Sequence, residues 1–165
     1  MAASRRRGSL RPWLERAVGR VLAWERARAR VELTLLDAVA MRRLNRRATG
    51  RRGLTDVLAF PLPQPDGALL GDVYICPDAA RRWVDGVPRP TFHVPRSGRT
   101  SNVQRATCDV DEELVRLTVH GTLHVLGYDH PDGRGRTRSA MWRRQERYVR
   151  RLLGTGGGRG GGGER

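Results

Sequence analysis

Three of the four histidines in this chain lie within eleven residues of one another, and their spacing is that of a metal site. His120 and His124 are four residues apart, so on a helix both would project from one face about one turn apart. Gly127 allows the chain to leave that helix, and His130 follows where it can fold back toward the same face. Three imidazoles without a fourth protein ligand are typical of catalytic zinc, which keeps one position for water. We therefore predict one Zn²⁺ per chain, although ligand type alone leaves copper, nickel and iron open.

The chemistry expected at such a site comes from the metal rather than from a side chain. Zinc lowers the pKa of a bound water from roughly 16 to about 7, so a zinc-bound water is the predicted catalytic group. Zinc peptidases of the H-E-x-x-H type add a glutamate base, but Gly121 holds that position here. Asp129, the nearest carboxylate in sequence, is expected to orient a ligand, and no residue stands out as general base. His93 lies in a Pro-, Gly- and Arg-rich stretch and is expected at the surface.

The charge of the chain points to a polyanionic partner. Its 165 residues carry a formal net charge of +15, and all 32 basic residues are arginine. A small basic domain attracts polyanions, of which nucleic acid is the commonest in the cytosol. The sequence has no run of about 18 apolar residues and no apolar segment typical of a secretory signal, so we expect no membrane association and a cytoplasmic location. Two cysteines are too few for a disulfide scaffold.

Hydrophobic periodicity and capping residues predict the elements that must position the histidines. Strands are expected over 31–36, 57–60 and 69–76, the last two forming a hairpin around the turn 63–67. Residues 46–53 are predicted to be a basic turn. Helices are expected over 12–28, from Asp37 through Leu44, from 77 to about 84, from Asp111 to Gly127 and over 137–153. The last helix would carry an apolar stripe of Met141, Trp142, Gln145, Tyr148, Val149 and Leu152.

The remaining segments lack such periodicity. Residues 1–11 form a basic lead, and residues 85–108 are predicted to be a long loop because they are rich in Pro, Gly, Ser and Arg. Residues 154–165 are predicted to be a disordered tail because most of them are glycine. Residues 12–153 then form a single domain of ordinary size.

The segment from His120 to His130 reads H-G-T-L-H-V-L-G-Y-D-H and resembles the H-G-x-L-H-x-x-G-Y-D-H signature of the YbeY family. Further agreement lies at Leu44–Asn45, 55–61, 70–75, Met141 and Glu146. Members of this family are bacterial zinc-dependent endoribonucleases of ribosomal RNA maturation. The resemblance implies an α+β fold, in which a small mixed β-sheet is flanked by helices. It also implies single-strand-specific cleavage of RNA near the 3′ end of 16S rRNA, a part in ribosome quality control and the ribosomal subunit as a partner.

One position departs from the family pattern. The family carries an arginine six residues before its Thr-Asp-Val motif, whereas this chain has Thr49. Threonine cannot neutralise a phosphate, so a neighbouring guanidinium would have to do so. We expect Arg51 to bind the phosphate in its place, with Arg47 as the lesser candidate and Arg52 contributing to the same basic turn.

Two other functions remain compatible with these residues. A zinc peptidase would use the same three ligands, although Gly121 and the basic charge count against it. A non-catalytic ribosome-assembly factor would use the zinc only for structure, although structural zinc sites normally have four protein ligands. Metal analysis together with RNA cleavage would distinguish these functions.

Overall fold

The computed structural model describes residues 10–84, 110–131, 133 and 135–154. Its elements confirm the predicted α+β fold, with a small mixed sheet and flanking helices. No helix in the described part of the chain is long and apolar enough to span a bilayer. In chain order the elements are α1 (Leu10–Trp24), β1 (Ala29–Leu35), α2 (Ala38–Thr49), β2 (Val57–Pro63), β3 (Leu69–Ile75), α3 (Pro77–Val84), α4 (Val110–Val125), the 3₁₀ turn η1 (Arg136–Arg138) and α5 (Ala140–Gly154).

Most of the segments that lack periodicity fall outside the described residues. These are the basic lead up to residue 9, the long loop over 85–108 with His93, and the glycine-rich tail from residue 155 onward. At the borders, Leu10 and Arg11 belong to α1, and Gly154 is the last residue of α5. Pro12 fits the first turn of α1 because the first N–H groups of a helix have no intrahelical partner.

The sheet has the strand order β1-β3-β2. β1 runs parallel to β3, and β2 runs antiparallel to it as the predicted hairpin. Leu33 and Ala59 both pair with Val73, which places Val73 at the centre of the sheet. β2 continues through Pro61 to Pro63, beyond its predicted end at Phe60. Proline is tolerated there because β2 is an edge strand, in which one side of the backbone needs no partner strand.

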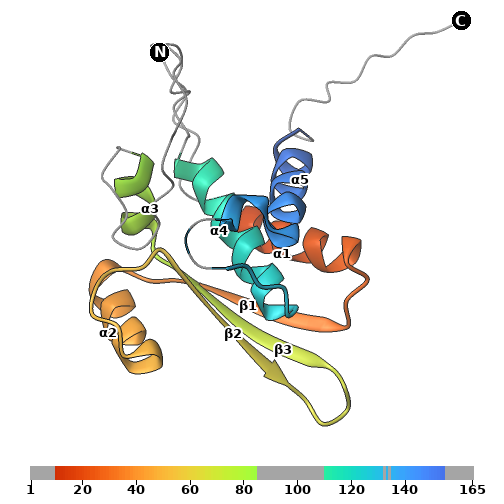
Figure 1. The fold of residues 1–165 in the computed structure, drawn as a ribbon, viewed down its shortest axis with the longest axis horizontal. Coiled ribbons are helices and arrows are strands. Elements are labelled where there is room, and N and C mark those ends of the chain that lie inside the picture. Colours follow the sequence, from red (N-terminus) through yellow and green to blue (C-terminus); the bar gives the residue numbers. More distant parts are fainter. Residues whose placement is uncertain (1–9, 85–109, 132, 134, 155–165) are drawn as a thin grey trace, which may run out of the picture.

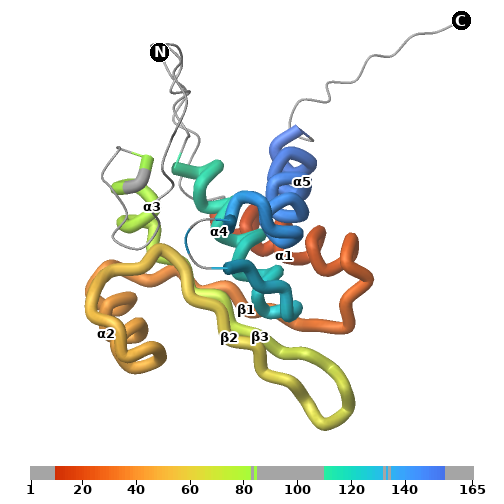
Figure 2. Tube along the Cα trace, viewed as in Figure 1, coloured from red at the N-terminus to blue at the C-terminus, as the bar shows by residue number. Residues whose placement is uncertain are grey.

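The helix α4 lies across one face of the sheet and is covered on its other side by α1 and α5 (Figure 1). Two glycines permit its close approach. A Cβ at Gly121 of α4 would fall 2.6 Å from Cγ1 of Val73, and Gly71 of β3 faces Val125 of α4 in the same way. The Cα trace shows α2 set apart at one end of the sheet and the β2–β3 turn at the other (Figure 2). The first two histidines of the predicted metal site therefore lie on a helix that is held from both sides.

Two helix boundaries differ from those predicted. α1 ends at Trp24 rather than at residue 28, because Arg26 adopts a left-handed conformation with φ of 50°. The Arg26 and Ala27 N–H groups then donate to the carbonyls of Ala23 and Leu22, a Schellman ending that glycine usually provides. α2 continues to Thr49, so the turn predicted from residue 46 begins only at Gly50, whose φ is 71°.

Polar side chains determine where two of the helices, α2 and α5, begin. Asp37 caps α2 as predicted, its Oδ1 accepting from Ala40 N at 2.8 Å. α5 begins at Ala140 rather than at residue 137, because Ser139 Oγ accepts from Trp142 N at 3.1 Å and so caps the helix there. The residues just before it form the 3₁₀ turn η1 instead of a first α-helical turn. This turn brings Arg136 toward the histidine cluster.

Candidate metal centre

The structure brings His120, His124 and His130 together. One nitrogen from each ring lies within 4.8 Å of the others. His120 and His124 project from the same face of α4, and His130 lies in the segment that follows that helix. The predicted convergence of the three imidazoles is thus present, and the cluster could hold a metal ion.

The nitrogen atoms fit a metal ion as ligands. Nε2 of His120 and Nε2 of His124 face each other at 3.0 Å. Nε2 of His130 is buried and has no hydrogen-bond partner among the described residues. In a tetrahedral zinc site, Zn–N distances of about 2.0–2.1 Å would separate two ligand nitrogens by roughly 3.3 Å. The Nε2 atoms of His120 and His124 are therefore close to the spacing that a bound ion requires.

The electrostatics of the cluster favour neutral imidazoles, which are the metal-binding form. Burial lowers the pKa of His120 to about 3, and the neighbouring charge of His124 acts in the same direction. Burial also lowers the pKa of His124, followed by the charge of His130, and Asp129 only partly opposes this. Since metal ligands must be deprotonated, two of the rings are prepared for metal binding at neutral pH.

The segment that carries His130 is fixed by the end of α4. Gly127 has φ of 88°, and the N–H groups of Gly127 and Tyr128 donate to the carbonyls of His124 and Leu123. This is the Schellman ending that Gly127 predicts. Oδ1 of Asp129 accepts from the backbone N–H of His130 at 2.8 Å. Asp129 thus holds the segment of the third imidazole through this backbone N–H rather than through a ring nitrogen.

Tyr128 is held by a second polar cluster, remote in sequence. Its hydroxyl donates to Oε2 of Glu25 at 2.7 Å, and Tyr148 and Arg144 donate to Oε1 of the same carboxylate. The Glu25 side chain is only 8% exposed, so these bonds form largely away from water. They join the end of α1 to α5 and to the segment preceding His130.

The histidines lie in an open cleft of about 1000 Å³. Its wall is formed by the end of α2, the following turn and strand β2, and Arg51 and Arg52 are among the lining residues. Arg47 is exposed on α2 and is not part of this lining. Of the three arginines predicted to bind phosphate, two therefore face the same cleft as the imidazoles.

Thr49 and Asn45 brace the turn that carries Arg51. Thr49 Oγ1 donates to the backbone carbonyl of Asn45 at 2.8 Å, and it lies 2.9 Å from the side-chain Oδ1 of Asn45. The same hydroxyl accepts from the backbone N–H of Arg51 at 3.2 Å. Asn45 Nδ2 donates to the Gly53 carbonyl at 3.2 Å. The residue at position 49 thus supports the loop, whereas a charge on the cleft wall must come from its neighbours.

Two residues close to the cluster were not singled out in the sequence. Gln145 was assigned to the apolar stripe of the last helix, yet its Oε1 accepts from Nδ1 of His120 at 2.7 Å. A guanidinium nitrogen of Arg136 lies 3.5 Å from Nε2 of His120. An amide within an otherwise apolar stripe was the available signal for Gln145. Nothing in the arginine-rich sequence distinguishes Arg136 from its neighbours.

Comparison with known proteins identifies the family. A sequence profile described as Endoribonuclease YbeY matches residues 4–86 and 98–153. The chain is similar to an Endoribonuclease YbeY of Anaeromyxobacter sp., 38% identical over 128 residues that span 76% of this chain and 57% of that protein. It is also similar to one of Streptomyces griseus, 34% identical over 134 residues that span 72% of this chain and 71% of that protein. The first match thus covers little more than half of its relative.

A solved structure supports the fold independently. The solution structure of a Thermotoga maritima protein superposes with a TM-score of 0.53 at 24% identity, and covers 91% of this chain and 86% of that one. At this identity the likeness concerns the fold alone. The fold, the histidine signature and the matched profile agree, and the chain belongs to the YbeY family.

Proposed function

We propose that this protein is a zinc-dependent, single-strand-specific endoribonuclease that acts in the cytoplasm on the 3′ end of 16S rRNA, in association with the ribosomal subunit. The observation that carries the proposal is the imidazole cluster in an arginine-lined cleft, with the Nε2 atoms of His120 and His124 facing each other at 3.0 Å. Relatives that carry the name endoribonuclease support the reaction class.

The three imidazoles have defined parts in this proposal. His120, His124 and His130 would hold one zinc ion, since their nitrogens converge and the His130 Nε2 atom is buried without a partner within the described residues. When bound, zinc supplies a Lewis acid for a phosphate oxygen and lowers the pKa of a water at the open position. The low pKa of His120 keeps its ring neutral and available as a ligand.

The arginines would bind the RNA backbone. Arg51 and Arg52 line the cleft and can place guanidinium groups against the phosphate beside the scissile bond. Arg136 supplies a third guanidinium, 3.5 Å from Nε2 of His120. Positive groups held at this place would offset the charge that develops on the phosphate in the transition state.

Two observations favour RNA over a peptide substrate. The net charge of +15 suits a polyanion. Position 121, where zinc peptidases place a glutamate base, is packed against Val73 so closely that a side chain would collide with the sheet. A peptidase would therefore need a base from another element.

Metal content and RNA cleavage together test the proposal. We expect about one zinc per chain by mass spectrometry, and cleavage of a single-stranded ribosomal RNA fragment. His124→Ala should lose both, because two imidazoles remain, whereas His93→Ala is the matched histidine control and should keep both. Full zinc in His124→Ala would contradict the ligand assignment. A zinc-loaded protein that cleaves peptides and leaves RNA intact would indicate a peptidase, and one inert on both would indicate an assembly factor.

A further inference from the structure

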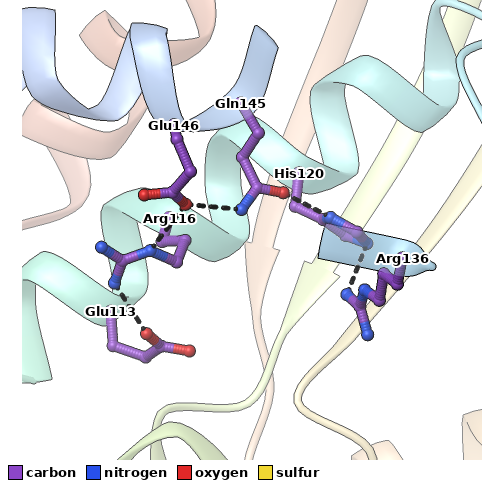
Figure 3. A network of polar contacts seen from close by, with 6 residues as sticks. All are labelled: Glu113, Arg116, His120, Arg136, Gln145 and Glu146. Atoms are coloured by element: carbon purple, nitrogen blue, oxygen red, sulfur yellow. Dashed lines mark hydrogen bonds and ion pairs between the residues drawn. The ribbon is translucent and has the colours of Figure 1, made fainter. Parts of the chain in front are cut away.

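A continuous network of polar contacts runs from Glu113, buried in the first turn of α4, to the histidine cluster (Figure 3). Arg116 donates to Glu113 at 3.0 Å and to Glu146 at 3.2 Å. Gln145 Nε2 donates to the same Glu146 oxygen at 3.1 Å, and Gln145 Oε1 accepts from Nδ1 of His120 at 2.7 Å. These contacts thus link two carboxylates, a guanidinium, an amide and the imidazole of His120.

The carboxylate of Glu146 determines which way the Gln145 amide points. An ionised carboxylate can only accept hydrogen bonds, and Glu146 is paired with the Arg116 guanidinium. Burial alone would lower the pKa of Arg116, but the Glu146 and Glu113 carboxylates more than offset this, so the guanidinium stays charged. The amide must therefore present its NH₂ group to Glu146. Its oxygen is then left facing His120.

The amide in turn determines which nitrogen of His120 carries the proton. An amide oxygen can only accept, so the neutral imidazole must hold its proton on Nδ1. The lone pair is then on Nε2, which is the atom that faces His124 at 3.0 Å. Gln145 is 2% exposed and His120 is 6% exposed, so water cannot readily replace either partner.

We propose that Gln145 is a positioning residue that holds the His120 proton on Nδ1 and directs Nε2 at the metal, and that Glu146 and Arg116 lock the amide in the required orientation. The proposal rests on the metal site proposed above. It goes beyond packing, because a residue that only filled space at position 145 would leave the choice of tautomer open. An oriented, neutral imidazole binds zinc more tightly than one that must first change tautomer.

The first experiment measures the tautomer itself, without metal. Two-bond ¹H–¹⁵N correlation spectra of the ¹⁵N-labelled, metal-free protein distinguish a proton on Nδ1 from one on Nε2. We expect His120 of the wild type to carry it on Nδ1. Gln145→Met, which has a similar shape and no acceptor oxygen, should shift His120 toward the Nε2 tautomer or a mixture. The exchange variant Gln145→Glu/Glu146→Gln retains an acceptor toward His120 and an amide donor between the two side chains, and should keep the proton on Nδ1.

The second experiment measures zinc affinity by competition with a chromogenic chelator. We expect Gln145→Met to raise the Kd for zinc by about 10- to 100-fold, the usual cost of losing a partner of a ligating histidine. The exchange variant should stay within about threefold of the wild type. Arg150→Gln, at an exposed position of the same helix, is the matched control and should leave the Kd unchanged.

The outcomes separate this proposal from that of the metal site. A proton on Nε2 of His120 in the wild type would overturn the positioning role, whatever the metal content. Equal weakening by Gln145→Met and the exchange variant would also overturn it, because packing rather than the acceptor would then decide affinity. Zinc binding by none of the proteins, the wild type included, would instead contradict the metal site.

Discussion

Gly121 of α4 lies against Val73 of β3 so closely that a Cβ at Gly121 would fall 2.6 Å from Cγ1 of Val73. The residue next to it is His120, so this contact determines how deeply the helix that carries His120 sits on the sheet. It also explains why no glutamate base stands at position 121. The glycine is required by packing, so no carboxylate can stand at this position beside the neighbouring imidazole.

The first prediction tests this contact. Gly121→Ala should lower the free energy of unfolding by about 1–3 kcal/mol, the usual cost of overpacking a well-filled core. Denaturant unfolding followed by circular dichroism measures it. Gly19→Ala is the matched control, because Gly19 is exposed in α1 and its added Cβ would have no neighbour within 4 Å. That change should be neutral or stabilising by about 0.5–1 kcal/mol. A Gly121→Ala protein as stable as the wild type would show that the sheet shifts at Val73 to accommodate the added methyl group at no cost in stability.

The second prediction concerns Glu25 and pH. Burial alone would raise the pKa of Glu25, but hydrogen bonds from Tyr148, Arg144 and Tyr128 outweigh it, and the net pKa lies below the ordinary 4.5. The ionised form therefore stabilises the fold fully above pH 4.5, and this contribution is lost as pH falls through the lower folded-state value. Glu25→Gln should cost about 2 kcal/mol at pH 7, as expected for hydrogen bonds to a buried charge.

The control for this prediction is Glu15→Gln. Glu15 pairs with Arg11 on the surface, where its side chain is 51% exposed, so its loss should cost under about 1 kcal/mol. Denaturant midpoints of the wild type and both variants, measured from pH 7 down to pH 3, provide the comparison. The gap between the wild type and Glu25→Gln should narrow toward the acid end. A gap that stays constant with pH would show that the Glu25 charge does not contribute.

Local features of the site could be predicted from the sequence, and long-range ones could not. The convergence of the three imidazoles follows from two features of the sequence. His120 and His124 are four residues apart on a helix, and Gly127 adopts the positive φ that lets the chain turn back after that helix. The end of α1 was missed because Arg26 occupies a conformation usually taken by glycine. Gln145 was read as part of an apolar stripe because its partner His120 lies 25 positions away on another helix. Such a pairing exists only once α4 and α5 have packed.

The third prediction concerns RNA binding by the basic surface of α2. Arg46 and Arg47 are exposed in the last turn of this helix, next to the turn that lines the cleft. RNA affinity should fall with salt, with a log-log slope of about −0.7 for each phosphate contact on a single strand. Replacing both arginines by glutamine should reduce the slope by up to about 1.4. Binding is measured by fluorescence anisotropy at salt concentrations from about 50 to about 200 mM, over which phosphate contacts lose much of their affinity.

The same double replacement at Arg16 and Arg20 is the charge-matched control. Both are exposed on α1 and carry the same charge, so any general effect of net charge appears in both proteins. We expect the α1 replacements to leave the slope close to that of the wild type. Equal slopes for the two double variants would argue against a binding surface on α2, and a salt-independent affinity would argue against phosphate contacts altogether.

The last prediction concerns Arg51, which we propose takes the place of an arginine at position 49. Thr49 holds the backbone N–H of Arg51 at 3.2 Å, and Arg51 lines the cleft that contains the three imidazoles. A guanidinium that acts mainly on the transition state should affect turnover more than binding. Arg51→Ala should therefore lower cleavage at saturating RNA by roughly tenfold, equivalent to about 1.4 kcal/mol, with zinc content unchanged.

Arg47→Ala removes an equal charge outside the cleft lining and should lower turnover far less. Adding Thr49→Arg to Arg51→Ala should restore much of the rate, since position 49 lines the same cleft. Single-turnover and steady-state cleavage assays measure these effects. Wild-type turnover in Arg51→Ala, or equal losses in Arg47→Ala, would mean that the phosphate is neutralised elsewhere, and Arg136, 3.5 Å from Nε2 of His120, would be the next residue to replace.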